Sequence, residues 1–314
     1  MPRIIQPEQV EPVVRALLGS IDICDGGTSE QRGVIAAFVS GYWGRDDLDL
    51  DALAPLTADE TAAAIADAPA RRRLREFMVL LEMCRHPLTA EQVARTDSYA
   101  AAVHESGPGL DLARELVQEG AEFAMADYMR RTELVYTDLS EPSLRGKYDD
   151  DLDEPDLELV ARLKSMQDLP EGTLGHAYFS FLDRHGFEFP GETTTAPAVF
   201  VAHDMCHTLT GYDTSGEEEI GVNSMQVALN DSDAHWLQLL GSLAIHEAGF
   251  FSNDQFIPKT ATLERDGAAA ILAEAFRRGV ECTDDYTKAD HLALAHLPLE
   301  EVRAQFGIPE RQVY

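Results

Sequence analysis

Apolar residues recur at intervals of three and four along most of the chain, the pattern of helices that bury one face. The first example is formed by Val10, Val13, Val14, Leu17 and Leu18. No segment alternates apolar and polar residues with a period of two over a useful length, so strands are not expected. The sequence therefore predicts an all-α fold.

Helix starts in the first half are marked by capping residues. Thr28 or Ser29 is expected to cap a helix that runs to residue 42, Thr57 with Glu60 has the spacing of a capping box, and Thr89 is placed to cap the following helix. Further helices are expected over residues 72–84, 110–131, 157–164, 176–182, 196–209, 222–229, 234–251, 261–279 and 298–306.

With 314 residues, the chain is long enough for two domains with separate cores. Residues 137–156 mix prolines with an acidic run, Tyr148–Asp156, and contain few apolar residues, which is typical of a solvated linker. This predicts two helical domains, 1–136 and 157–314, joined by an acidic, proline-containing linker over 137–156.

The formal net charge of −31 disfavours binding to nucleic acid and to anionic lipid headgroups. No stretch of 18 apolar residues occurs and the N-terminus lacks the apolar core of a signal peptide, so we expect a cytoplasmic protein without a transmembrane segment. Peripheral contact with the inner face of the membrane, and homo-oligomer formation, remain open. The four cysteines are widely spread and form no CxxC pair, which argues against a cysteine zinc site.

The strongest chemical signal is His203-Asp204-Met205-Cys206-His207, followed after eleven residues by Glu219. Histidines four apart share one face of a helix, because each residue advances it by about 100°. Two imidazoles with one or two carboxylates suit a divalent metal and leave a position open for water or substrate. The pattern predicts a metal site at His203, Asp204, His207 and Glu219, although histidines at this spacing also occur by chance.

Several roles near this motif stay open. Gly211 and Gly216 let the chain turn back, so that Glu217, Glu218 or Glu219 could supply the distant carboxylate. Asp204 could be a metal ligand, orient a histidine, or act as the catalytic proton acceptor. Further along, His246-Glu247 could add a ligand or a proton shuttle, or be an ordinary satisfied pair.

The first half resembles tellurite-resistance TerB-like helical domains. The resemblance rests on the acidic, glycine-containing turn at residues 22–30 and on residues 77–84, which precede a capped helix. Asp22, Asp25 and Glu30 could bind a cation, or they could cap a helix and favour its positive N-terminal end.

The second half resembles the coenzyme Q (ubiquinone) biosynthesis protein four family over about residues 157–310. Three segments carry the resemblance in order: Leu169-Pro-Glu-Gly-Thr-Leu-Gly-His-Ala-Tyr178, the His203-Asp204-x-x-His207 motif with Leu209-Thr-Gly-Tyr212 behind it, and residues 297–309 near the C-terminus. Two features depart from the family pattern: the run from Thr193 to Phe200, where the family usually has arginine-rich sequence, and the triple glutamate ending at Glu219.

The resemblance implies an all-helical domain in which His203, Asp204, His207 and Glu219 bind zinc, or alternatively magnesium. It further implies an apolar cavity for a prenyl tail and a role in replacing a ring carboxyl group by hydroxyl, as a lyase or oxidoreductase of quinone biosynthesis. Side chains that could contact the tail, or could simply be core, are Phe200, Met205, Met225 and Trp236.

Two other functions stay open at this point. One is a non-enzymatic, metal-stabilised protein that binds isoprenoid lipid or acts as a scaffold. The other is a zinc-dependent hydrolase, because Asp204 stands where zincin proteases place a general-base glutamate.

Overall fold

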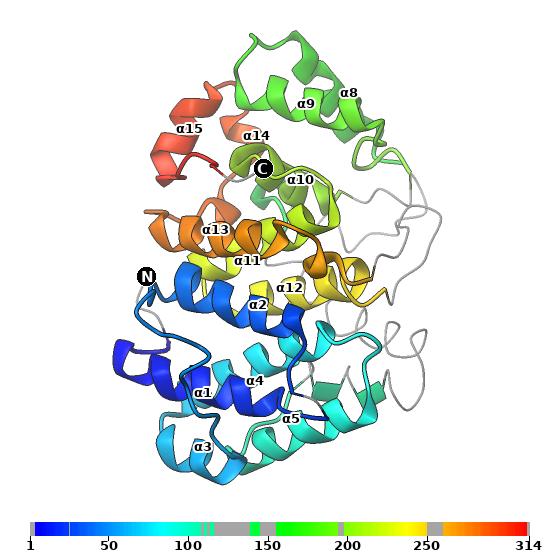
Figure 1. Ribbon diagram of the computed structural model, residues 1–314. Helices are drawn as coiled ribbons and strands as arrows, with labels where there is room; N and C mark the ends of the chain where they lie inside the picture. The colour runs from blue at the N-terminus through cyan, green and yellow to red at the C-terminus, as the bar shows by residue number, and fades with distance from the viewer. Residues whose placement is uncertain are drawn as a thin grey trace. The chain divides into compact units, whose positions relative to one another are not determined.

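The computed structural model is built from helices (Figure 1). It describes residues 4–24, 26–107, 110–111, 114–115, 139–144, 155–193, 198–249 and 260–312. Within these residues no strand occurs, and only two isolated antiparallel bridges are present, Thr173 with Pro298 and Ala248 with Thr260. The predicted all-α fold is confirmed.

The chain divides into two compact units that are not consecutive halves. Unit 1 comprises residues 1–131, 214–280 and 313–314, and unit 2 comprises residues 132–213 and 281–312. This division differs from the expected domains 1–136 and 157–314, because residues 214–280 group with the N-terminal helices.

The helices of unit 1 are mostly longer than two turns. They are α1 (Val10–Ser20), α2 (Ser29–Ala37), α3 (Ala58–Ala64), α4 (Ala68–Met83), α5 (Ala90–Ala102), α11 (Gly216–Leu229), α12 (Asp233–His246) and α13 (Ala268–Glu281). Shorter turns are η1 (Pro7–Gln9), a π-helical turn η2 (Phe38–Tyr42) that continues α2, and η5 (Thr262–Glu264).

An aromatic core explains why the late helices belong to unit 1. The ring of Phe38 lies 4.6 Å from that of Phe77 and 5.1 Å from that of Phe276, and Phe77 meets Trp236 edge-on at 5.0 Å. These rings come from η2, α4, α13 and α12, so residues near both ends of the sequence share one apolar interior. The sequence gives no indication that these distant rings pack together.

The predicted capping residues act as expected. Thr28, rather than Ser29, caps α2: its Oγ1 accepts from the Gln31 N–H at 3.1 Å, and the Gln31 side chain accepts from the Thr28 N–H at 3.1 Å. Thr57 and Glu60 form the same reciprocal box at α3, and Thr89 caps α5. These side chains satisfy N–H groups that the first helical turn leaves without partners.

Unit 2 is assembled around α9. Its elements are η3 (Pro142–Leu144), α8 (Leu157–Lys164), η4 (Ser165–Asp168), α9 (Leu174–His185), α10 (Phe200–Thr210), η6 (Tyr286–Lys288), α14 (His291–Leu294) and α15 (Leu299–Phe306). Helix α9 contacts α8, α10, α14 and α15. Its start is fixed by the Thr173 cap and by the Leu174 N–H, which donates to the Leu297 carbonyl at 2.9 Å.

Part of the predicted linker is packed into unit 2. The acidic run from 148 to 154 lies outside the described residues, but Glu141 is fully buried and Leu144 nearly so. The Glu141 carboxylate lies 2.8 Å from His291 Nδ1 and accepts from the Leu292 N–H at 2.9 Å. These partners offset the cost of burying the acid, so this described piece is not a solvated tether.

Some helix boundaries differ from the sequence expectation. Helix α12 ends at His246 instead of continuing to residue 251, because the chain leaves the helix at Glu247, whose carbonyl accepts from the Ala261 N–H at 2.9 Å. Helix α11 starts earlier than expected, at Gly216, and α13 starts later, after Gly267 with φ +89°. The expected helix over 110–131 lies largely outside the described residues.

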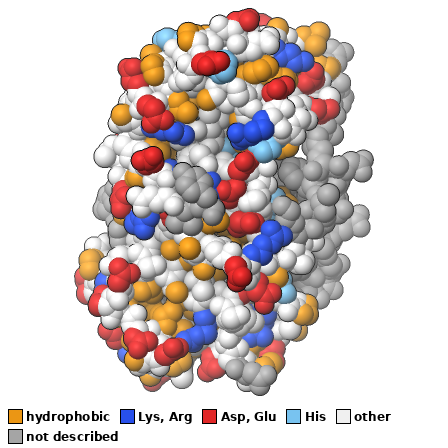
Figure 2. Space-filling model, turned by 45° about the horizontal axis from the view of Figure 1, so that its top comes forward, with side chains coloured by type: hydrophobic (Ala, Val, Ile, Leu, Met, Phe, Trp, Pro, Cys, Tyr) orange, Lys and Arg blue, Asp and Glu red, His pale blue; other side chains and the backbone are white. Residues whose placement is uncertain are grey.

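Charged side chains are interspersed on the visible surface. On the face shown in Figure 2, acidic groups are scattered among basic and apolar ones and do not merge into one patch. Among the helices that the structure describes, none is long and apolar enough to cross a membrane.

Candidate metal centre

Helix α10 places the two predicted imidazoles together in unit 2. His203 Nε2 and His207 Nε2 are 3.1 Å apart, and the rings meet edge-on with their centroids 4.7 Å apart. Two imidazole nitrogens bound to one tetrahedral zinc ion at 2.0–2.1 Å would be about 3.3–3.4 Å apart. The observed separation is therefore close to that of two ligands of one ion.

His207 is held in one orientation. Its side chain is 2% exposed, its ring stacks on Phe181 at 5.6 Å, and its Nδ1 lies 3.1 Å from the Tyr212 carbonyl. A carbonyl can only accept, so Nδ1 carries the proton and Nε2 presents its lone pair toward His203. Histidines that bind a metal through one ring nitrogen usually donate a hydrogen bond from the other ring N–H to a carbonyl or carboxylate.

The C-terminal end of α10 is fixed by two arginines. Arg303 donates to the carbonyls of Thr208 and Leu209 at 3.2 and 2.8 Å, and Arg311 donates to the carbonyl of Gly211 at 2.7 Å. The last carbonyls of a helix lack partners within it and attract positive charge. This contact explains why the C-terminal segment with Arg303 accompanies the histidine motif in the same unit.

Asp204 is not brought together with the histidine pair. Among the described residues, no carboxylate oxygen of Asp204 lies within 4.8 Å of a ring nitrogen of both His203 and His207. It is half-buried, and its charge acts instead on Tyr178, a fully buried residue of α9. Burial raises the pKa of the Tyr178 phenol well above its usual value, and the charge of Asp204 raises it further. The role of Asp204 as a ligand or a proton acceptor stays a prediction.

The three glutamates that the sequence left as alternatives occupy the first turn of α11, in unit 1. Glu217 pairs with Arg265 at 3.2 Å, and Glu218 accepts from the Ser215 hydroxyl at 3.3 Å. The backbone carbonyl of Glu219 accepts from Asn223 at 2.9 Å. Glu219 stays the predicted distant ligand, with Glu217 and Glu218 as the alternatives.

The predicted tail contacts are mostly core residues. Met205 and Met225 are fully buried and Trp236 is nearly so, while Phe200 is half-buried. Trp236, however, also lines an apolar groove of about 180 Å³ between α4 and α12 in unit 1. The lining residues are Arg75, Glu76, Val79, Leu80, Asp233, Trp236, Leu237, Leu239, Leu240 and Leu243.

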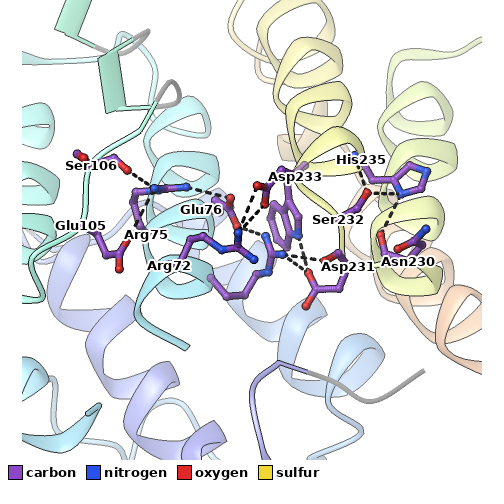
Figure 3. A network of polar contacts seen from close by, with 12 residues as sticks. Arg72, Arg75, Glu76, Glu105, Ser106, Asn230, Asp231, Ser232, Asp233 and His235 are labelled. Carbon is purple, nitrogen blue, oxygen red and sulfur yellow. Dashed lines mark hydrogen bonds and ion pairs between the residues drawn. The ribbon is translucent and has the colours of Figure 1, made fainter. Parts of the chain in front are cut away.

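A charged network borders this groove (Figure 3). Arg73, which is fully buried, pairs with Glu76 and with Asp231 at 2.5 Å, and its guanidinium lies 4.5 Å over the Trp236 ring. Burial lowers the pKa of Arg73 to about 10, although the negative charge of Asp231 opposes this shift. In Figure 3 the neighbouring Arg75 side chain points toward Glu105 and Glu76.

Sequence reasoning missed a second group of ionisable side chains, which lies in unit 1. Glu30 of α2, His86 after α4 and Glu247 after α12 lie together. Of these, Glu30 was considered with Asp22 and Asp25, and Glu247 was considered with His246 as a possible ligand or proton shuttle. Asp25 is outside the described residues. Burial first, and then Glu247, raise the pKa of the Glu30 carboxyl to about 9. No motif spacing could have revealed this group, since His86 and Glu247 are 161 residues apart.

Comparisons with known proteins leave the family open. No protein-family model matches the chain, and no curated protein matches it. The chain is similar to a crystal structure from Nostoc punctiforme, described provisionally as a ubiquinone biosynthesis protein, with 15% identity and a TM-score of 0.34. The match covers 77% of this chain and 99% of that chain. A TM-score this low does not show a shared fold, so the TerB-like and coenzyme Q-related resemblances stay predictions.

Proposed function

We propose that this protein binds a divalent metal ion at His203 and His207, and binds a prenyl-tailed aromatic lipid of the ubiquinone-precursor kind. Zinc is the first candidate for the metal and magnesium the alternative. The observation that supports the metal site is the oriented imidazole pair of α10, with Nε2 atoms 3.1 Å apart. The lipid class comes from the motif resemblance.

The donor set suits zinc better than magnesium. Imidazole nitrogen is a common ligand of zinc, whereas magnesium prefers oxygen ligands and bound water. Glu219 is the proposed carboxylate ligand, as the motif resemblance implies. When bound, the ion would polarise a carboxylate or phenol oxygen of a ring. Asp204 would hold or accept a proton beside it, next to the buried phenol of Tyr178.

The groove of unit 1 is the proposed site for the apolar tail. Its walls are leucine and valine side chains of α4 and α12, together with Trp236, whereas Arg75, Glu76 and Asp233 supply charge. An apolar wall with few polar groups is typical of small-molecule sites. A volume of about 180 Å³ accommodates part of a prenyl chain rather than a long one.

The metal part is tested by elemental analysis of the purified full chain. His207→Ala and His203→Ala should each reduce bound zinc, because each removes one of two adjacent nitrogen ligands. His296→Ala is the matched control, since His296 is exposed in the same unit. Equal zinc content in all four proteins would remove the basis of the proposal.

The lipid part is tested by calorimetric titration with a prenylated hydroxybenzoate. Leu237→Gln places an amide in the groove wall and should weaken binding, whereas Leu157→Gln alters a leucine that is 72% exposed in unit 2. No heat of binding together with no shift in the melting temperature of the wild type would refute a lipid ligand.

The same His203→Ala protein separates an enzyme from a scaffold. If the protein modifies the ring, this variant should lose turnover of the prenylated substrate while it still binds the lipid. A scaffold would show no turnover in the wild type, and the variant would keep lipid binding.

A further inference from the structure

Three ionisable side chains from distant parts of the sequence meet inside unit 1. Glu30 lies in the first turn of α2, His86 in the turn after α4, and Glu247 directly after the last residue of α12. One potential ligand atom from each lies within 4.8 Å of the others. We call these residues the Glu30 cluster.

The contacts within the Glu30 cluster are specific but incomplete. His86 Nε2 lies 2.5 Å from Glu247 Oε1 and 3.8 Å from Glu30 Oε2. The other Glu247 oxygen accepts from the Leu263 N–H at 2.8 Å. Glu30 Oε1, although buried, accepts no hydrogen bond from any donor among the described residues. The cluster thus contains a buried oxygen that still lacks a partner.

The charges of the Glu30 cluster balance only if the cluster also holds a proton or a cation. The Glu30 side chain is 5% exposed, that of Glu247 is fully buried and that of His86 is 21% exposed. Within the described part of the chain, neither glutamate forms an ion pair with lysine or arginine. One imidazolium can neutralise one carboxylate, so the second buried carboxylate needs a proton or another cation.

We propose that Glu30, His86 and Glu247 bind a first-row divalent cation such as Zn²⁺, Fe²⁺ or Mn²⁺. Two carboxylates and one imidazole form a mixed oxygen and nitrogen donor set, which these ions accept. A doubly charged ion neutralises both glutamates and gives Glu30 Oε1 a partner. The partly exposed edge of His86 provides access, and three protein ligands leave a coordination position open.

Binding requires only a small rearrangement. Two donors on one ion at 2.0–2.2 Å stand about 3 Å apart or more, so His86 and Glu247 must move slightly apart from 2.5 Å. Glu30 and His86, now 3.8 Å apart, would approach each other. The Leu263 N–H can keep its bond to the second oxygen of Glu247 and orient that carboxylate, as outer partners of metal ligands do.

The site is independent of the proposed function, and the experiment keeps the two apart. Full-length protein is stripped with chelator and titrated with Zn²⁺, and separately with Mn²⁺, while calorimetry and elemental analysis count bound equivalents. The titration is done on the wild type, on His203→Ala/His207→Ala, on Glu30→Gln and on Glu247→Gln. Glu8→Gln is the matched control, because Glu8 is exposed in the same unit.

We expect one equivalent to remain in His203→Ala/His207→Ala. Glu30→Gln and Glu247→Gln should bind this equivalent roughly tenfold more weakly or worse, while Glu8→Gln binds it as the wild type does. The metal should also raise the melting temperature of the wild type, and this rise should be lost in Glu30→Gln. A purely structural role for the glutamates does not predict a metal-dependent rise.

Several results would overturn the site. One is an equal number of tight equivalents in the wild type and in folded Glu30→Gln. Another is loss of all bound metal in folded His203→Ala/His207→Ala, which would leave the proposed function standing. If that double variant does not fold, the difference in bound equivalents between wild type and Glu30→Gln decides the question alone.

Discussion

Glu82 offers the sharpest test of how burial governs stability in unit 1. It lies in α4 with none of its surface exposed. Burial raises the pKa of its carboxyl well above the usual value, and the Thr96 hydroxyl, which opposes this shift, contributes less. The folded protein therefore keeps Glu82 protonated at pH values where the unfolded chain has released the proton. Replacing Glu82 by Gln retains the shape of the neutral acid but removes its titration.

The sign and size of the effect follow from proton linkage. Below the ordinary pKa of about 4.5 the carboxyl is protonated in both the folded and the unfolded state. There it makes no pH-dependent contribution to the free energy of unfolding. Above it, the folded protein holds one more proton than the unfolded chain, so the free energy of unfolding falls by about 1.4 kcal/mol per pH unit. Between pH 5.5 and 7.5, Glu82→Gln should gain about 2.7 kcal/mol relative to the wild type while the folded carboxyl stays protonated.

Tryptophan fluorescence makes this measurement specific to unit 1. Both tryptophans of the chain, Trp43 and Trp236, are buried there. Urea unfolding at pH 5.5, 6.5 and 7.5, with chelator present, gives the difference between variant and wild type at each pH. Glu8→Gln is the control, because Glu8 is exposed in the same unit and its difference should not change with pH. A pH-independent difference for Glu82→Gln would refute the reasoning.

Three further predictions concern packing and charge in unit 1, all measured by urea unfolding. Arg73→Ala should cost about 3–5 kcal/mol, because it removes a fully buried guanidinium and leaves two partly buried acidic partners without their cation. Arg32→Ala, at an exposed ion pair, should cost at most about 1 kcal/mol. Gly41→Ala should cost about 1–3 kcal/mol, since its Cβ would lie 2.2 Å from the Ala273 carbonyl oxygen. Gly33→Ala should instead stabilise α2 by up to about 1 kcal/mol, because its Cβ would have its nearest neighbour at 3.7 Å. Equal effects within either pair would contradict the packing described above.

Features that depend on neighbouring residues were predictable from the sequence. The apolar spacing from Val10 to Leu18 gives the buried face of α1, and the Thr57–Glu60 spacing gives the start of α3. The histidine pair could also be predicted, since helical geometry alone brings His203 and His207 onto one face. In each case the interacting groups lie within one or two helical turns, so local rules are sufficient.

Features that depend on tertiary packing were not predictable. Nothing in the sequence around α12 or α13 indicates that Trp236 and Phe276 pack against Phe77 and Phe38. For the same reason the domain boundary was expected at a proline-containing acidic stretch, where composition changes, and not at residue 214. The position of Asp204 relative to the imidazoles also depends on packing against α9, which a helical wheel does not include.

Glu30 and Glu82 show that the same substitution can separate two roles of a buried acid. In metal-free protein, Glu30→Gln and Glu82→Gln should each raise the free energy of unfolding at neutral pH. Burial raises the pKa of both carboxyls. Each acid therefore keeps, in the folded protein, a proton that the unfolded chain releases. Zn²⁺ should then distinguish them. At 100 times its dissociation constant a bound ion adds about 2.7 kcal/mol to the folded state, and only Glu30→Gln should lose that gain. If Zn²⁺ stabilises both variants as much as the wild type, Glu30 is a protonated core residue like Glu82, and the unpartnered oxygen reflects packing and not a cation site.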